Sequence, residues 1–182
     1  GNDMIRVKLA VIIAADVRGG IGIKGKLPWR LEGDHPRFKE ITMGACVIMG
    51  RATYQSIPGG LPGRTMIVVS NTLGVGDVPT NVVLARSYEA AVAVAENLTP
   101  SHGQYFVIGG AGLFDIALSE ANELYYTMVH LEAECDTFVT ELKMRNWILK
   151  EPTKQVYLDS EKRIPSHRYA TFVRCASLEG DE

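Results

Sequence analysis

Short apolar runs rich in β-branched residues recur along the chain, and each of them predicts a buried strand. The first covers residues 7–15 almost without a polar interruption, which is typical of a strand buried on both faces. The same pattern predicts strands over residues 45–49, 65–70, 81–85, 104–108, 124–130, 155–158 and 168–176. Helices are expected over residues 36–41, 53–57, 88–98 and 113–118, and Ser87 can cap the third.

The order of these elements indicates the fold class. Strands and helices alternate as far as Glu123, and only strands follow it. Alternation is typical of parallel sheets, whereas successive strands form antiparallel edges. We therefore predict one α/β domain over residues 4–177, with a central, mostly parallel eight-stranded sheet, an antiparallel C-terminal edge and flanking helices. Residues 1–3, before Met4, are interpreted as a cloning remnant, and residues 178–182 as a frayed acidic tail.

Composition excludes several classes of function. The chain has 19 Lys and Arg against 21 Asp and Glu, so a nucleic-acid partner is disfavoured. Cys46, Cys135 and Cys175 form no CxxC pair, and the four histidines do not cluster with them, so neither a metal site nor a disulfide framework is expected. No apolar run approaches the roughly 20 residues of a membrane helix. We expect a cytoplasmic monomer without a membrane partner.

Residues 20–26 match two phosphate-binding patterns, GxGxxG and GxxxxGK. Both mechanisms need a helix to begin directly afterwards, because its free N–H groups bind the phosphate. Pro28 biases Leu27 away from the helical region, and Leu27 stands where a magnesium-binding Ser or Thr is required. We therefore favour a flexible, Gly-rich loop, and an ordinary surface loop is an equally good interpretation of the segment taken alone.

Asp34 stands between Leu31 and Phe38, two apolar residues seven positions apart. A carboxylate among apolar residues is costly to bury without a partner, and the cationic or amidine-like edge of a ligand would be such a partner. Alternatively, Asp34 caps a helix that starts near Pro36. The segment by itself favours the cap.

Several motifs, taken together in their order along the chain, shift the balance from the helix-cap interpretation of Asp34 to the ligand-binding one. They are Leu27-Pro28-Trp29, Asp34 with Arg37-Phe38-Lys39, residues 47–53, Ser56-Ile57, residues 61–64, Ile108-Gly109-Gly110 and Asp136-Thr137-Phe138. Together they resemble the dihydrofolate reductases of bacterial type, with short loops, from about Leu9 to Phe172. The resemblance implies an enzyme of one-carbon metabolism and tetrahydrofolate biosynthesis, an oxidoreductase that reduces 7,8-dihydrofolate to 5,6,7,8-tetrahydrofolate with NADPH and is a target of antifolate inhibitors.

The resemblance also implies roles for residues on the substrate side. Asp34 would accept hydrogen bonds from the 2-amino group and the N3 side of the pterin, and Thr127 would steady that carboxylate and a linking water. Arg64 would bind the glutamate α-carboxylate through its planar fork; without the resemblance, a solvated arginine in a turn is the simpler interpretation. The implied catalytic residues are Asp34, Trp29, Thr127 and Leu27. The implied substrate-binding residues are Ile12, Ile13, Ala14, Leu31, His35, Phe38, Ser56, Ile57, Leu61, Arg64 and Ile108.

On the cofactor side, small residues stand at two predicted helix starts, Gly50 to Thr53 and Gly109 to Gly112, where phosphate can approach backbone N–H groups. In the family the bond between the paired glycines is cis. Arg51 and Arg86, with Ser70, would meet a 2′-phosphate, which favours NADPH over NADH. The implied cofactor residues are Ala14, Ile21, Gly22, Lys26, Gly50, Arg51, Ala52, Thr53, Val69, Ser70, Asn71, Arg86, Ile108, Gly109, Gly110, Ala111, Gly112, Leu113 and Phe114.

Two departures from the family pattern concern the pocket. Phe114 stands where many relatives have a tyrosine, and His35-Pro36 follows Asp34 where an apolar residue is more usual. Two other functions on the same scaffold are alternatives: the related reductase of a riboflavin-pathway pyrimidine, and a non-catalytic pterin- or nucleotide-binding module. The pairing of Asp34 with Arg64 argues against the first, and the intact set of Trp29, Asp34 and Thr127 argues against the second.

Overall fold

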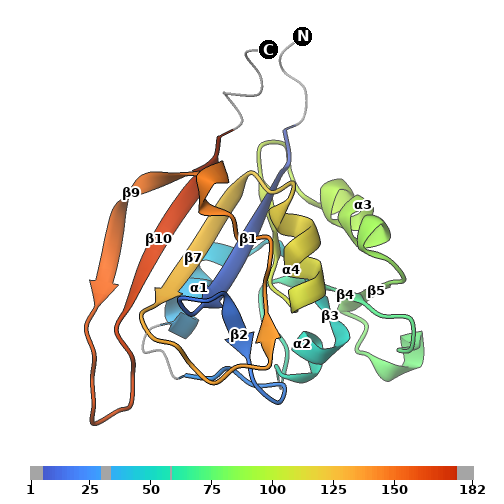
Figure 1. Cartoon of the computed structure of the whole chain (residues 1–182). Coiled ribbons are helices and arrows are strands. Elements are labelled where there is room, and N and C mark those ends of the chain that lie inside the picture. Colours follow the sequence, from blue (N-terminus) through green and yellow to red (C-terminus); the bar gives the residue numbers. More distant parts are fainter. Residues whose placement is uncertain (1–5, 30–33, 58, 176–182) are drawn as a thin grey trace.

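A central eight-stranded sheet organises the computed structural model, which describes residues 6–29, 34–57 and 59–175, without the side chains of residues 34 and 35. The strands lie in the order β5-β4-β3-β6-β1-β7-β10-β9 (Figure 1). Their bounds are Lys8–Ala15 (β1), Cys46–Gly50 (β3), Thr65–Val69 (β4), Val82–Ala85 (β5), Gln104–Val107 (β6), Glu123–Val129 (β7), Trp147–Val156 (β9) and His167–Arg174 (β10).

Strand directions follow the order of the elements in the sequence. All neighbours from β5 to β7 are parallel, whereas β10 is antiparallel to both β7 and β9. The prediction of a mostly parallel sheet with an antiparallel C-terminal edge is therefore confirmed. The helices are Asp34–Thr42 (α1), Arg51–Gln55 (α2), Tyr88–Leu98 (α3) and Ala111–Leu118 (α4), with short 3-10 turns at Val75–Asp77 (η1) and Met144–Asn146 (η2). Ser87 caps α3 by accepting a hydrogen bond from the N–H of Ala90 at 3.0 Å, as expected.

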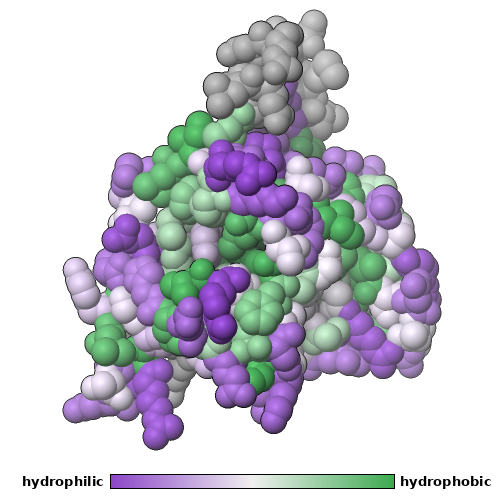
Figure 2. All heavy atoms as spheres, viewed as in Figure 1, coloured by the Kyte–Doolittle hydropathy of each residue, from purple (hydrophilic) through white to green (hydrophobic). Residues whose placement is uncertain are grey.

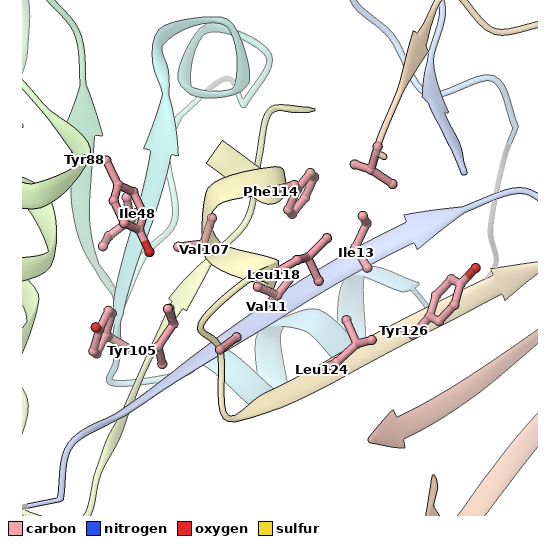
Figure 3. Close-up of a cluster of buried hydrophobic side chains, with 14 of the residues drawn as sticks. Val11, Ile13, Ile48, Tyr88, Tyr105, Val107, Phe114, Leu118, Leu124 and Tyr126 are labelled. Carbon is pink, nitrogen blue, oxygen red and sulfur yellow. The ribbon is translucent and has the colours of Figure 1, made fainter. Parts of the chain in front are cut away.

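Side chains of β1 alternate between the two faces of the sheet. Val11 and Ile13 join the core cluster that also contains residues of α3 and α4, and Figure 3 shows Ile13 beside Leu118. Ala10 and Ile12 join the opposite cluster, against which Ile41 of α1 packs. The end of β1 thus presents Ile12 on the α1 face, and the core on the other face holds the strand in place.

Sequence patterns missed part of the β structure. β9 begins at Trp147, eight residues before the predicted start. Only Trp147 is buried in this edge strand, so no alternation of apolar residues is required there. Figure 2 shows hydrophobic residues interspersed among hydrophilic ones on one face of the molecule, and Ile148 and Leu149 of β9 are both exposed. A second, two-stranded sheet joins β2 (Gly20–Gly22) to β8 (Thr137–Phe138), and it was not predicted.

Among the residues that the structure describes, no helix has the length and hydropathy that a membrane crossing needs. The segments interpreted as a remnant (1–3) and a tail (178–182) lie outside the described residues.

Candidate functional site

Two helix starts meet at the carboxyl ends of β3 and β6, the edge at which open parallel sheets bind ligands. Gly50 precedes α2 and Gly110 precedes α4, and neither helix has a side-chain cap or an acidic residue in its first turn. The Gly50 N–H donates to the Gly109 carbonyl at 2.9 Å. The uncapped N–H groups of both helices are therefore available to an anionic ligand, since helix N-termini favour negative charge.

Both the surroundings and the backbone conformation of residue 109 require glycine. Its φ is +132°, and a Cβ there would lie 3.1 Å from Thr53 Oγ1 and 3.3 Å from Phe114 Cε2. The Gly109-Gly110 bond is cis, as the resemblance implies. Phe114 itself is buried in the core on the α4 face (Figure 3), and its ring lies next to Gly109.

The side chains of two arginines donate hydrogen bonds to the turn that follows β4. Arg51 donates to the Thr72 hydroxyl, and Arg86 Nη1 donates to the carbonyls of Ser70 and Leu73 at 2.8 and 2.5 Å. The Ser70 hydroxyl accepts from the N–H groups of Thr72 and Leu73 at 3.2 and 3.1 Å. Within the described part of the chain, neither guanidinium forms an ion pair with a carboxylate. The turn therefore offers cations and hydroxyls suited to a phosphate.

Thr72 belongs to this turn but was not among the predicted cofactor residues. A Ser-Asn-Thr run directly after a buried strand was the available signal, because hydroxyls there can bond backbone N–H groups and so shape the turn.

Residues 20–26 form no phosphate loop. Ile23 and Lys26 exchange two backbone hydrogen bonds of 2.9 Å, and Lys24 and Gly25 between them have φ values of +49° and +76°. The segment is thus a tight reversal after β2, and no helix begins there. Both phosphate-loop interpretations are wrong, for the reason that Pro28 indicated.

Asp136 ties this reversal to the segment around β8. Its N–H donates to the Gly22 carbonyl at 2.9 Å, and its Oδ2 accepts from the Lys24 N–H at 2.8 Å. That N–H, with the Thr137 hydroxyl, holds the pKa of the Asp136 carboxyl below its usual range. Leu27, beyond the reversal, is 55% exposed, so its side chain is free to contact a ligand.

Thr127 and Trp29 are predicted site residues that carry buried polar groups. Thr127 is buried in β7 and is paired in register with Ala14. Trp29 Nε1 is buried and has no hydrogen-bond partner in the described part of the chain. Because a buried N–H is normally satisfied, this atom indicates a missing partner such as a ligand or water. Asp34 begins α1, but its side chain, that of His35 and the whole of Leu31 lie outside the described residues.

The predicted apolar wall divides between the two faces of the sheet. Ile12, Ile57, Leu61 and Ile108 pack partly buried against the same cluster on the α1 face. The Ile13 side chain, by contrast, is 3% exposed and belongs to the opposite core. Only the backbone of Ile13 can therefore contribute to a site on the α1 face.

Arg64 is buried, not solvated. Its Nε donates to the Pro62 carbonyl at 3.0 Å and its Nη1 to Thr42 Oγ1 at 3.2 Å, and its guanidinium carbon lies 6.0 Å from the centre of the Phe38 ring. Burial lowers the pKa of the guanidinium, and no described carboxylate pairs with it. A buried cation without a counter-charge favours an anionic ligand.

The remaining predicted residues surround these groups. Ser56 is exposed, and its hydroxyl donates to the Thr53 carbonyl at 2.7 Å. Lys26, Ala52, Asn71 and Gly112 are exposed, and Ile21, Gly22, Val69, Ala111 and Leu113 are partly buried.

Comparison with known proteins identifies one family. The family model described as dihydrofolate reductase matches residues 8–174. The chain is 36% identical over 143 residues to a dihydrofolate reductase type 9 of Escherichia coli, covering 78% of this chain and 81% of that protein. It is 30% identical over 168 residues to the dihydrofolate reductase of Staphylococcus haemolyticus, covering 92% and 96%.

A solved structure is similar over the same extent. The dihydrofolate reductase of Enterococcus faecalis, in complex with NADP(H) and RAB-propyl, superposes with a TM-score of 0.76 at 34% identity. The match covers 92% of this chain and 96% of that one.

Proposed function

The chain belongs to the dihydrofolate reductase family, and from this premise we propose that it reduces 7,8-dihydrofolate to 5,6,7,8-tetrahydrofolate with NADPH. The observation that carries the proposal is the pair of arginines on the Ser70 turn, which form no ion pair with a described carboxylate, next to the two uncapped helix starts. A 2′-phosphate and a pyrophosphate need these two kinds of anion site. The buried Arg64 supplies a further one, suited to the carboxylate of a glutamyl tail.

When bound, NADPH supplies the hydride that moves from nicotinamide C4 to pterin C6. The protein's own residues orient the reactants. Asp34 holds the 2-amino and N3 edge of the pterin and its tautomer, with Thr127 steadying the carboxylate, and water delivers the proton to N5. Trp29 Nε1, which has no hydrogen-bond partner among the described residues, is suited to a water of this kind. Much of the rate enhancement then comes from orientation and electrostatics.

Four further statements belong to the proposal. Residues 4–177 form one reductase domain, which the family match over residues 8–174 supports. Antifolates bind at the dihydrofolate site, because an amidine-like edge pairs with the same Asp34. A monomer suffices, since one chain carries every residue of the site. A cytoplasmic location fits the three cysteines, which are all unpaired.

The proposal is tested by mixing the purified protein with NADPH and dihydrofolate and following the NADPH absorbance. We expect oxidation of one NADPH per tetrahydrofolate formed. Turnover of a ribosylamino-pyrimidine in place of dihydrofolate would identify the riboflavin-pathway alternative. Binding of both compounds without turnover would identify a non-catalytic module.

Arg51 and Arg86 give a prediction about cofactor choice. Replacing either by Ala removes a cation from the Ser70 turn, so we expect NADPH affinity to fall roughly tenfold to a hundredfold. NADH lacks the 2′-phosphate and should lose much less. Dissociation constants for both cofactors check this, with Arg145→Ala in η2 as an exposed-arginine control. Equal losses for NADPH and NADH would contradict the 2′-phosphate assignment.

A further inference from the structure

A fully buried carboxylate stands at the start of the Gly-rich loop. Asp16 directly follows β1 and has no exposed surface. Its Oδ1 accepts from the N–H groups of Arg18 and Gly20 at 2.9 and 2.8 Å, both within the loop. Its Oδ2 accepts from the N–H of Ala133 at 2.9 Å, which lies across from the loop in the connection between β7 and β8. One carboxylate therefore joins two segments.

The contacts around Asp16 reinforce this junction. The Arg18 guanidinium lies 3.7 Å from Asp16 Oδ2, donates to the Ala133 carbonyl and stands 5.6 Å from the centre of the Phe138 ring. The Cys135 thiol lies 3.9 Å from Asp16 Oδ2. Although burial acts to raise the pKa of Asp16, the three N–H donors and Arg18 hold it below its usual value. The group is therefore a carboxylate at neutral pH.

The carboxylate of Asp16 and the residue Asp136 bind opposite ends of the short segment from Gly20 to Lys24. Asp16 binds the backbone at Gly20, where β2 begins, and Asp136 binds the backbone at Gly22 and Lys24, where it ends. Leu27 and Trp29 follow a few residues later. A shift at Gly20 would therefore be carried to Leu27 and Trp29, which the family resemblance implies are catalytic residues.

We propose that Asp16 is a positioning residue of the reductase. It touches neither substrate nor cofactor. Its carboxylate ties the Gly-rich loop to the segment carrying Ala133 and so sets where the loop's implied cofactor residues, Gly22 and Lys26, and the implied catalytic residue Leu27 lie. The inference rests on the proposed function, because it concerns the loop's part in that reaction.

Asp16→Asn separates the two halves of the junction. With the amide oxygen in the place of Oδ1, both bonds within the loop remain. The amide nitrogen then faces the Ala133 N–H, and because two donors cannot bond each other, the bond between the segments is lost. The substitution thus loosens the loop from its neighbour and keeps the local turn.

The test measures hydride transfer and two binding equilibria. In single-turnover experiments with NADPH and dihydrofolate, we expect Asp16→Asn to transfer hydride about tenfold to a hundredfold more slowly. NADPH should bind several-fold more weakly. Adenosine 2′,5′-bisphosphate, which lacks the nicotinamide, should bind as it does to the unchanged protein. If Asp16 only maintained the fold, Asp16→Asn would lower the affinity for NADPH and for the bisphosphate by the same factor.

The matched control is Asp115→Asn. Asp115 Oδ1 accepts from the N–H groups of Thr140 and Glu141 at 2.9 and 3.0 Å, and an amide oxygen can keep both bonds. The Thr140 hydroxyl near Oδ2 can accept from the new NH₂. We therefore expect unchanged hydride transfer from this variant.

Arg18→Ala provides a second variant in case Asp16→Asn folds poorly, because it removes the other side-chain bond to Ala133 from a partly exposed position. Arg18→Ala should also bind NADPH more weakly and adenosine 2′,5′-bisphosphate unchanged, with a smaller loss of NADPH affinity than Asp16→Asn. Wild-type hydride transfer in both variants would overturn the inference, as would equal weakening of both ligands. Failure of the unchanged protein to reduce dihydrofolate would instead overturn the proposed function.

Discussion

Asp34→Asn is expected to lose turnover by a factor of roughly 10² to 10⁴ at neutral pH, while the protein folds and binds NADPH as before. A carboxylate offers two acceptors to the 2-amino and N3 edge of the pterin, whereas an amide offers one acceptor and one donor. The charge-assisted, two-point contact is therefore lost. Steady-state kinetics with dihydrofolate and a separate NADPH titration check the two parts of this expectation.

The same variant distinguishes the two interpretations of Asp34. The residue begins α1, and Asn caps a helix about as well as Asp does. If Asp34 were only a cap, Asp34→Asn would keep its turnover, and that result would contradict the ligand-binding role. Asp77→Asn is the control, since Asp77 accepts from the Gly74 N–H at 2.7 Å in the exposed turn η1. We expect that variant to be as active as the unchanged protein.

Gly109→Ala is expected to cost the most stability. The added Cβ would meet Thr53 Oγ1 at 3.1 Å and Phe114 Cε2 at 3.3 Å, and the φ of +132° is one that side chains rarely adopt. Such a residue costs about 3 kcal/mol, which lowers the unfolding midpoint by about 10 °C in a chain of this length. NADPH should also bind more weakly, because Gly50 and Gly109 are joined directly. Thermal unfolding with and without NADPH measures both effects.

Gly112→Ala provides the matched control for stability. Gly112 lies in α4, and a Cβ there would meet no atom within 4 Å. Alanine is favoured over glycine inside a helix by roughly 0.5 to 1 kcal/mol, so this variant should be as stable as the unchanged protein or slightly more so. Equal stability of Gly109→Ala and Gly112→Ala would show that the close approach at Gly109 is relieved at little cost.

The central sheet could be predicted because burial leaves a local signal. β1 and β3 are covered on both faces, so nearly every residue in them is apolar, and the runs were found within one residue of their bounds. β9 lies at the sheet edge, with five consecutive exposed residues from Ile148 to Pro152, so no such pattern exists. The short pair β2 and β8 depends on a partner more than a hundred residues away, which a local pattern does not contain.

The candidate site divides in the same way. Gly109-Gly110 and Arg51 could be named from ordered motifs, because each motif is a contiguous stretch of chain, and Arg86 and Thr127 from the family resemblance that these motifs carry. Three properties depended on the tertiary structure. They are the burial of Arg64 against Thr42 and Phe38, the exclusion of the Ile13 side chain from the α1 face, and the junction at Asp16.

By itself, the sequence determined the order of the strands and helices of the central sheet, the family resemblance and the absence of a helix directly after Gly20 to Lys26, since each is recorded in neighbouring residues. Only the tertiary structure decided which charges are buried and which partners they have. Asp16 and Ala133 are 117 positions apart, and Arg64 and Thr42 are 22 apart. Because electrostatic free energy depends on burial and on distance in space, such pairs become visible only when the chain is folded.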